Sequence, residues 1–135
     1  PSPTPKPTPN PAQVEAAYKA STTYTTVVNL DKDGTADEGK EVHFISRILI
    51  FVKNSSGNTV GANVVAQASY SDSIIQVEFP FGVDLSQLNE DDILEVWGTD
   101  TGVFSGSNAF GGIVQAVAIN AKYMTDQTTG YQIGG

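Results

Sequence analysis

The sequence contains no cysteine, and it has only one histidine and one tryptophan in 135 residues. Without cysteine the chain can form neither a disulfide bond nor a zinc or iron–sulfur site with thiolate ligands. Many exported bacterial proteins also lack cysteine, so this absence does not fix the redox compartment. Long apolar runs are missing too, and none approaches the length of a membrane-spanning helix.

Positive charge is also scarce. The chain has seven lysines and arginines against fifteen acidic residues, which gives a formal net charge of −8. Because one of the lysines, Lys6, lies among the first eleven residues, the rest of the chain carries a formal charge of −9. A field of this sign repels the phosphate backbone of nucleic acids. We therefore expect no nucleic-acid partner.

Proline is concentrated at one end of the chain. Six of the seven prolines occupy the odd positions from Pro1 to Pro11. Each proline fixes its own φ near the polyproline II value and biases the preceding residue towards extended geometry. The run therefore predicts a semi-rigid spacer of roughly 3.1 Å per residue. We divide the chain into an extracellular stalk, residues 1–11, and one domain, residues 12–135.

The stalk predicts a location outside the cytoplasm, because Ser/Thr/Pro spacers commonly separate an extracellular module from its anchor. The chain opens on Pro1 with neither a start methionine nor a signal sequence. We interpret it as the mature form of an exported protein, with a lipidated residue upstream of Pro1. This predicts a membrane-anchored lipoprotein on the cell surface, in contact with the membrane only through that upstream anchor.

The pattern beyond the stalk predicts a mainly β domain that begins with a short helix. Asn10 is a favourable N-cap, and Gln13 completes a capping box with it. Pro11 suits the first helical position, so a helix is predicted over residues 13–20. The β-branched residues between positions 21 and 30 fit either an edge strand or an irregular connection. Alternation and turn residues then predict strands over residues 41–52, 62–69, 73–79, 93–98 and 113–123.

Three shorter features complete the predicted order of elements. Residues 54–58 carry the asparagines and glycine of a hairpin turn, and Asp84 is placed to cap a helical turn over residues 85–88. A glycine-rich excursion is expected over residues 98–112, and a frayed tail from Thr125. A three-stranded meander, a helical turn and two more strands form the chain order of an OB-fold. The predicted fold is a five-stranded Greek-key barrel with a short N-terminal helix and a helical turn between its third and fourth strands.

Four segments carry a resemblance to a known family. They are Tyr18-Lys19-Ala20-Ser21, Gly39-Lys40-x-Val42-x-Phe44, Asp91-Asp92-Ile93-Leu94-x-Val96-Trp97-Gly98-Thr99-x-Thr101-Gly102 and Ile119-x-Ala121-Lys122-Tyr123. Together they resemble the small OB-fold domains of Gram-positive bacterial lipoproteins and surface proteins, some of which are labelled toxin-gene regulators by homology. The resemblance covers residues 12–124 and implies an OB barrel held outside the cytoplasm. It implies no activity, and no site residue is carried over from it.

Residues suited to catalysis are few. The one histidine, His43, alternates with apolar neighbours, and no serine or acid lies at a spacing typical of a catalytic triad. We interpret it as a strand histidine that faces solvent. Glu90, Asp91 and Asp92 form a tight acidic turn, whereas a glycosidase needs carboxyl groups on opposed walls of a cleft. We therefore predict a protein that is not an enzyme and has no catalytic residues.

The acidic loop, residues 31–38, is the best candidate for a metal site. Calcium prefers several carboxylate and carbonyl oxygens on a flexible loop that contains glycine. As an EF-hand loop the segment fails at two positions, because Ala36 replaces the invariant glycine and Val42 replaces the bidentate glutamate. A solvated acidic loop is the alternative, and no other cofactor is expected. The candidate ligands are Asp31, Asp33, Asp37 and Glu38.

Exposed aromatic side chains on an OB barrel often form a platform for bases or sugars. Phe79 and Trp97 alternate with outward-facing residues, so we place both in the core. The other aromatic candidates lie in predicted loops, where some are expected to cap the ends of the barrel, and the foremost cation beside them is an arginine. The candidate binding residues are Arg47, Tyr70, Phe81, Phe104 and Phe110.

These observations lead to two functional hypotheses. The first is a non-enzymatic OB-fold module tethered to the outside of the cell envelope, which binds an envelope protein, a peptide or a glycan. The second is a secreted calcium-dependent or polysaccharide-active module that uses the acidic loop. A calcium titration followed by melting temperature separates them, because a ligand bound only by the native state raises the midpoint.

Overall fold

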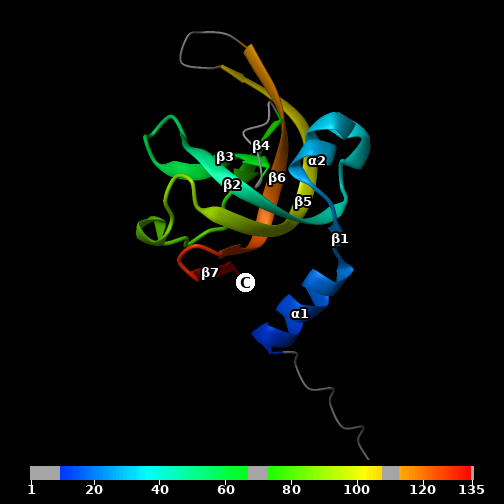
Figure 1. The fold of residues 1–135 in the computed structure, drawn as a ribbon, viewed down its shortest axis with the longest axis vertical. Helices are drawn as coiled ribbons and strands as arrows, with labels where there is room; N and C mark the ends of the chain where they lie inside the picture. Colours follow the sequence, from blue (N-terminus) through cyan, green and yellow to red (C-terminus); the bar gives the residue numbers. More distant parts are fainter. Residues whose placement is uncertain (1–9, 67–72, 108–112, 135) are drawn as a thin grey trace, which may run out of the picture.

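The computed structural model describes residues 10–66, 73–107 and 113–134 of the chain. The helical elements are α1 (Pro11–Ser21), α2 (Val27–Asp33) and the 3₁₀ turns η1 (Gly34–Asp37) and η2 (Leu85–Gln87). The strands are β1 (Thr23–Tyr24), β2 (Glu41–Lys53), β3 (Thr59–Ala66), β4 (Ile74–Glu78), β5 (Ile93–Ser107), β6 (Ile113–Asp126) and β7 (Gln132–Gly134). Figure 1 shows the strands gathered into one strongly curved sheet, with α2 beside it and α1 leading away from β1.

Five of the strands close into a ring in the order β2–β3–β4–β6–β5, with β5 pairing back onto β2. The β4–β6 pair is parallel, and the other four pairs of the ring are antiparallel. β1 extends the sheet as a parallel neighbour of β2, and β7 adds an antiparallel neighbour to β6. The prediction of a mainly β fold, with a three-stranded meander followed by two more strands, is confirmed.

The ring encloses the apolar core. Along the first half of β2, Val42, Phe44 and Ile48 are buried and alternate with partly exposed residues, as a strand with one buried face requires. Phe79 is partly buried and packs against this core, near where the sequence placed it. Inward-facing residues of the other strands complete one continuous cluster, including Ala62, Val64, Ile75, Val77, Leu94, Val96, Val117 and Ile119.

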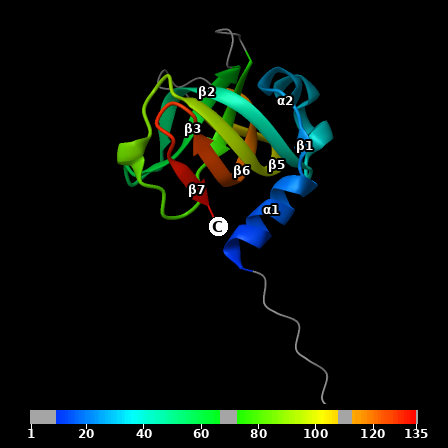
Figure 2. The ribbon, with the colours of Figure 1, turned by 60° about the horizontal axis from the view of Figure 1, so that its bottom comes forward.

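The helix α1 forms where the sequence predicts it. The side chain of Asn10 accepts a hydrogen bond from the backbone of Gln13, and the Gln13 side chain accepts one from the backbone of Asn10. None of the eleven residues of α1 is buried, so the helix rests on the outside of the sheet. In Figure 2 it extends between β1 and the C-terminal end of β7. Within the described ranges, no helix is both long and apolar enough to cross a membrane.

The region that fitted either an edge strand or an irregular connection contains both a short strand and a helix. The two residues of β1 form the edge strand, and α2 follows directly. Thr26 caps α2 by accepting a hydrogen bond from the backbone of Asn29. Val27 and Leu30 lie on one face of α2 and are buried in the core. This tertiary burial outweighs the weak helix propensity of the β-branched residues.

The local turn signals are confirmed. The side chain of Asn54 accepts hydrogen bonds from the backbone of Ser56 and Asn58, which closes the hairpin turn between β2 and β3. Asp84 caps η2 by accepting a hydrogen bond from the backbone of Ser86.

The prediction of an excursion from residue 98 is wrong for its first ten residues, because β5 continues to Ser107. Two irregularities in its pairing with β6 accommodate the glycines, one after Trp97 and one after Asp100. At Gly98 a Cβ atom would lie 2.4 Å from the carbonyl oxygen of Asn120, so only glycine allows the two strands to approach. The rest of the predicted excursion, residues 108–112, lies outside the described residues.

The prediction of a frayed tail is also wrong. Asp126 is fully buried, and its Oδ1 accepts backbone hydrogen bonds from Thr128 at 2.9 Å and Thr129 at 3.0 Å. This turn brings the chain back as β7, and Ile133 enters the core. The tail is fixed by one buried carboxylate and one buried apolar side chain.

Candidate functional site

A turn that follows β4 presents Phe81 to solvent. The backbone N–H of Phe79 donates a hydrogen bond to the carbonyl of Val60 at 2.9 Å. The Phe79 and Phe51 rings meet edge-on, with their centroids 6.3 Å apart. Gly82 then adopts a φ of 84°, a left-handed conformation that other residues rarely adopt. The turn places the side chain of Phe81 at its tip, where it is fully exposed. The phenyl ring is therefore displayed from a well-anchored base.

The far end of this turn is anchored as well. The backbone of Asp84 donates a hydrogen bond to the Tyr131 hydroxyl at 2.9 Å. The Asp84 carboxylate accepts bonds from the Ser86 hydroxyl at 2.7 Å and the Ser86 backbone at 3.1 Å. These two bonds hold the pKa of Asp84 below its usual value. Asp84 therefore stays ionised at the far end of the turn.

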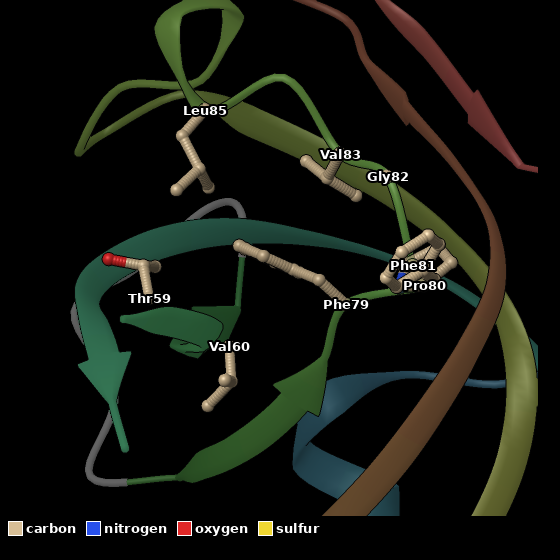
Figure 3. Close-up of a pocket in the computed structure, with 8 residues that line it drawn as sticks. All are labelled: Thr59, Val60, Phe79, Pro80, Phe81, Gly82, Val83 and Leu85. Atoms are coloured by element: carbon tan, nitrogen blue, oxygen red, sulfur yellow. The ribbon is translucent and has the colours of Figure 1, made fainter. Parts of the chain in front are cut away.

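Two hollows flank Phe81, and we call this turn with its two hollows the Phe81 surface. The first hollow has a volume of about 240 Å³, and Figure 3 shows Val83 and Leu85 on one side of it and Thr59 and Val60 on the other, with Phe79 between them. The second has a volume of about 450 Å³ and lies between the turn and the residues Tyr131, Gln132, Ile133 and Gly134.

A third hollow, of about 370 Å³, shares Pro80 with the first two. It lies between α1 and β6 and is lined by Val14, Tyr18, Ala121, Lys122 and Tyr123. The concave surface therefore continues from the Phe81 surface to the base of α1.

The Phe81 surface combines a mainly apolar first hollow, a second hollow of mixed polarity, and negative charge nearby. Glu78, directly before the turn, is exposed, and Asp84 within the turn is exposed and ionised. Among the described residues, none that lines the two hollows beside Phe81 carries a positive charge. Such a surface favours a ligand that offers an apolar group next to a cation.

The other predicted binding residues lie elsewhere or outside the described part. Arg47 is half-buried on β2, where its Nη1 donates to the carbonyl of Asp91 at 3.4 Å. Phe104 is half-buried on β5. Neither lines any of the three hollows above. Tyr70 and Phe110 lie outside the described residues.

The predicted acidic loop is mostly helical, because Asp31 and Asp33 lie in α2 and Asp37 lies in η1, directly before Glu38. The Lys40 ammonium lies 2.9 Å from the Asp37 carboxylate, and this contact lowers the pKa of Asp37. Within residues 10–66, 73–107 and 113–134, no group of three or more histidine or carboxylate side chains is arranged to hold a metal ion. Calcium binding by the four candidate ligands stays a prediction.

The sequence did not reveal a row of rings on the outer face of the sheet. Tyr24, His43, Trp97 and Tyr123 are direct register partners across β1, β2, β5 and β6. We call these four residues the aromatic row. Their alignment depends on strand pairing between distant segments, which no local sequence signal specifies.

The aromatic row corrects two predictions. Trp97 is buried, but it lies under α1 on the outer face and is not part of the core cluster. His43 does not simply face solvent, because its ring stacks on Trp97 at 4.6 Å and meets Tyr24 edge-on at 5.2 Å. Its Nε2 also lies 2.6 Å from a carboxylate oxygen of Glu95. Trp97 is buried and His43 is partly covered by neighbouring segments that the strand pattern alone does not show.

No protein-family model and no curated protein matches this chain. Among solved structures, one match is an aspartyl-tRNA synthetase-like protein of Leishmania major, with 16% identity and a TM-score of 0.47 over 84% of this chain and 25% of that protein. The chain therefore spans about a quarter of that protein's length. Another match is a DUF3299 family protein of Pseudomonas aeruginosa, with 19% identity and a TM-score of 0.46 over 99% of this chain and 89% of that one. At TM-scores this low, neither likeness assigns a fold or a function.

Proposed function

We propose that this chain is a non-enzymatic binding module that takes a protein or peptide partner on its Phe81 surface. The observation that carries the proposal is the full exposure of Phe81 on a turn that is anchored at both ends and flanked by two hollows. An exposed aromatic ring on a fixed turn contributes favourably to the free energy of binding when a partner covers it. Rigid presentation also lowers the entropy that binding costs.

We propose further that the domain is an OB-fold. The ring order β2–β3–β4–β6–β5, with one parallel pair between β4 and β6, supports this assignment. The turn η2, which lies between β4 and β5 along the chain, supports it as well. A partly open five-stranded Greek-key ring is the architecture of that fold. Because OB-folds serve many functions, the assignment adds no partner of its own.

The chemistry of the surface selects the partner class. Glu78 ends β4 directly before the Phe81 turn, Asp84 lies at the far end of that turn, and residues 12–135 carry a formal charge of −9. The first hollow has a mainly apolar lining. The partner we propose therefore presents an apolar side chain next to a lysine or arginine. A polyanion such as nucleic acid meets repulsion at the same surface.

A location outside the cytoplasm and a tether to the envelope are part of the proposal. They are supported by the alternating prolines of residues 1–11, which lead directly into the capped start of α1. A non-enzymatic role is supported by His43, since its ring is held between Tyr24 and Trp97 and its Nε2 contacts Glu95. These contacts hold the imidazole within the aromatic row and engage its Nε2 with a carboxylate.

Selection from a phage-displayed library of random peptides on the full chain tests the proposal. We expect the enriched peptides to carry an aromatic or aliphatic residue beside lysine or arginine. Phe81→Ala should weaken their binding about tenfold or more, as loss of a central aromatic contact does. Ile50→Ala is the matched control, because Ile50 is exposed on β2 and lines neither hollow.

Equal binding by the parent and the Phe81→Ala variant would refute the proposed surface. A glycan array run with the same two variants distinguishes the other ligand class. Binding there that depends on Phe81, without any enriched peptide, would show that the ligand is a saccharide and that the peptide assignment is wrong.

The calcium-dependent or polysaccharide-active alternative is tested separately. A melting temperature that rises with calcium concentration, and not with the same concentration of magnesium, would support it. Asp37→Asn should then remove the rise.

A further inference from the structure

Two rings of the aromatic row, those of His43 and Trp97, are stacked on each other. The rings of His43 and Trp97 lie 4.6 Å apart with an interplanar angle of 10°, and Tyr123 is the register partner of Trp97 on β6. Trp97 and Tyr123 are 8% and 7% exposed, although both lie on the outer face of the sheet. The rings are covered because α1 lies across them.

A positive charge from α1 occupies the space above these rings. The Nζ of Lys19 lies 4.0 Å from the centroid of the Trp97 ring and 5.7 Å from that of Tyr123. Glu15, one helical turn earlier, holds the same ammonium at 3.3 Å. An ammonium over the face of tryptophan, inside a partly desolvated site, is the geometry of a cation–π complex.

We propose that Trp97 and Tyr123 form a binding site for an alkylammonium group, and that Lys19 is its intramolecular occupant. A cationic ligand displaces Lys19 and lifts α1 from the aromatic row. Tyr123 also lines the third hollow, but neither Trp97 nor Tyr123 lines the two hollows beside Phe81. The proposal does not rest on the function proposed for the Phe81 surface.

The attachment of α1 is weak enough to permit displacement. The helix has eleven residues and none of them is buried, and a helix of that length is marginal in water on its own. Apart from Lys19, its contacts with the sheet centre on Tyr18. The Tyr18 hydroxyl donates a hydrogen bond to the Glu41 carboxylate, and the centroids of the Tyr18 and Tyr123 rings lie 5.6 Å apart. Segments with few buried contacts open at low free-energy cost.

The electrostatic surroundings favour a cation. Glu41 and Glu95 both lie on the outer face of the sheet beside the aromatic row. Burial alone would raise the pKa of Glu41, but hydrogen bonds from Tyr18 and Thr99 lower it, so this carboxylate stays charged. Lys122 lies 3.9 Å from Glu41 and offsets part of this charge. The balance of one lysine against two carboxylates leaves the uncovered row attractive to an ammonium.

A titration with tetramethylammonium chloride tests the proposal, with sodium chloride at equal ionic strength as the reference. Trp97 is the sole tryptophan, so its fluorescence reports on the site directly. In Lys19→Gln the site is vacated, and we expect half-maximal change at about tenfold lower concentration than in the parent, because no occupant has to be displaced. Lys19→Arg should behave like the parent. Lys32→Gln, which removes an equal charge from an exposed position on α2, should do so as well.

A direct measurement on the parent protein complements the variants and decides the question if Lys19→Gln fails to fold. The Nζ of Lys19 lies over the Trp97 ring, so NMR should find the signals of the adjacent ε-protons shifted upfield. Tetramethylammonium should return them to the values of a free lysine as the Trp97 fluorescence changes. An unchanged Lys19 signal at saturating tetramethylammonium, or an equal fluorescence response in Lys19→Gln and Lys32→Gln, would overturn the proposal.

Discussion

Phe81 and Trp97 are two aromatic side chains on the outside of the same ring of strands, and they differ in what lies above them. Phe81 is fully exposed on a turn fixed by backbone hydrogen bonds, and Trp97 is 8% exposed beneath α1. The first ring contributes almost nothing to folding, and the second contributes through its contacts. The burial of Trp97 therefore depends on the helix that covers it, whereas the exposure of Phe81 depends on the turn that carries it.

The charges near the two rings differ in the same way. Beside the aromatic row, Glu41 is held by Tyr18 and Thr99, and Glu95 is held by His43 at 2.6 Å and Gln127 at 3.3 Å. At the Phe81 surface the carboxylates are exposed to solvent. The carboxylates beside the aromatic row are therefore hydrogen-bonded within the chain, whereas those near Phe81 remain accessible to a partner.

The largest expected effect is on the covered ring. Trp97→Ala should lower the free energy of unfolding by about 3–5 kcal/mol, as truncation of a buried aromatic side chain does. Chemical denaturation followed by far-UV circular dichroism measures it, because the variant lacks the fluorescent probe. A loss below about 1 kcal/mol would show that α1 does not bury the ring in solution, and the contrast with Phe81 would disappear.

The sequence predicted correctly those features that depend on residues close together in the chain. The capping box of Asn10 with Gln13, the cap at Asp84 and the turn at Asn54 are local, so residue types within a few positions specify them. Phe81 was found for a similar reason, since the Pro80-Phe81-Gly82 sequence is a turn whose tip is exposed. These local signals located the Phe81 turn but not the aromatic row.

The features that the sequence did not reveal depend on distant partners. The aromatic row requires the register of β2 with β5 and of β5 with β6, which sequence alternation does not determine. The helix α2 forms among β-branched residues because Leu30 is buried by strands far along the chain. The ordered tail depends on Asp126, whose polar side chain gave no reason to expect burial.

The next largest effect is expected at Asp126, where β6 ends. The turn that follows Asp126 connects β6, which carries Tyr123, to residues 131–134, which line the second hollow beside Phe81. Asp126→Ala should lower the free energy of unfolding by about 2–3 kcal/mol, because the backbone donors of Thr128 and Thr129 lose the acceptor of two partly buried hydrogen bonds. Asp126→Asn keeps an acceptor for Thr128 and Thr129 and should remain close to the parent at pH 7. A neutral alanine variant would mean that the turn frays in solution.

The same residue sets a pH dependence. Burial and the neighbouring carboxyl of Asp92 raise the pKa of Asp126 to about 6, above its unfolded value. The native state therefore binds the extra proton first, so its stability should rise as the pH falls from about 7 through 6 towards 4, with a slope of up to about 1.4 kcal/mol per pH unit. Denaturation of the parent and Asp126→Asn across this range isolates the effect, since the variant should lack it. Equal slopes would contradict the assignment.

A smaller effect is expected where α1 is attached. Tyr18→Phe removes the hydrogen bond to Glu41 and should lower the free energy of unfolding by about 1 kcal/mol. The cover should also loosen, so the emission maximum of Trp97 should move to longer wavelength. Tyr24→Phe is the matched control, because the side chain of Tyr24 is largely exposed at the end of the aromatic row. A red shift in the control as large as that in Tyr18→Phe would mean that the hydroxyl of Tyr18 does not hold the helix.

The smallest expected effect on stability is that of Phe81→Ala, and it completes the comparison. Because the ring is fully exposed, its removal exposes no core and should change the free energy of unfolding by no more than about 0.5 kcal/mol. Thermal and chemical denaturation of the parent and the variant measure this change directly. A loss approaching that of Trp97→Ala would show that Phe81 folds back into one of its two hollows, in which case the hollow is filled by the chain itself. A neutral result, together with the loss of peptide binding, would mean that the phenyl ring is maintained in water for a partner.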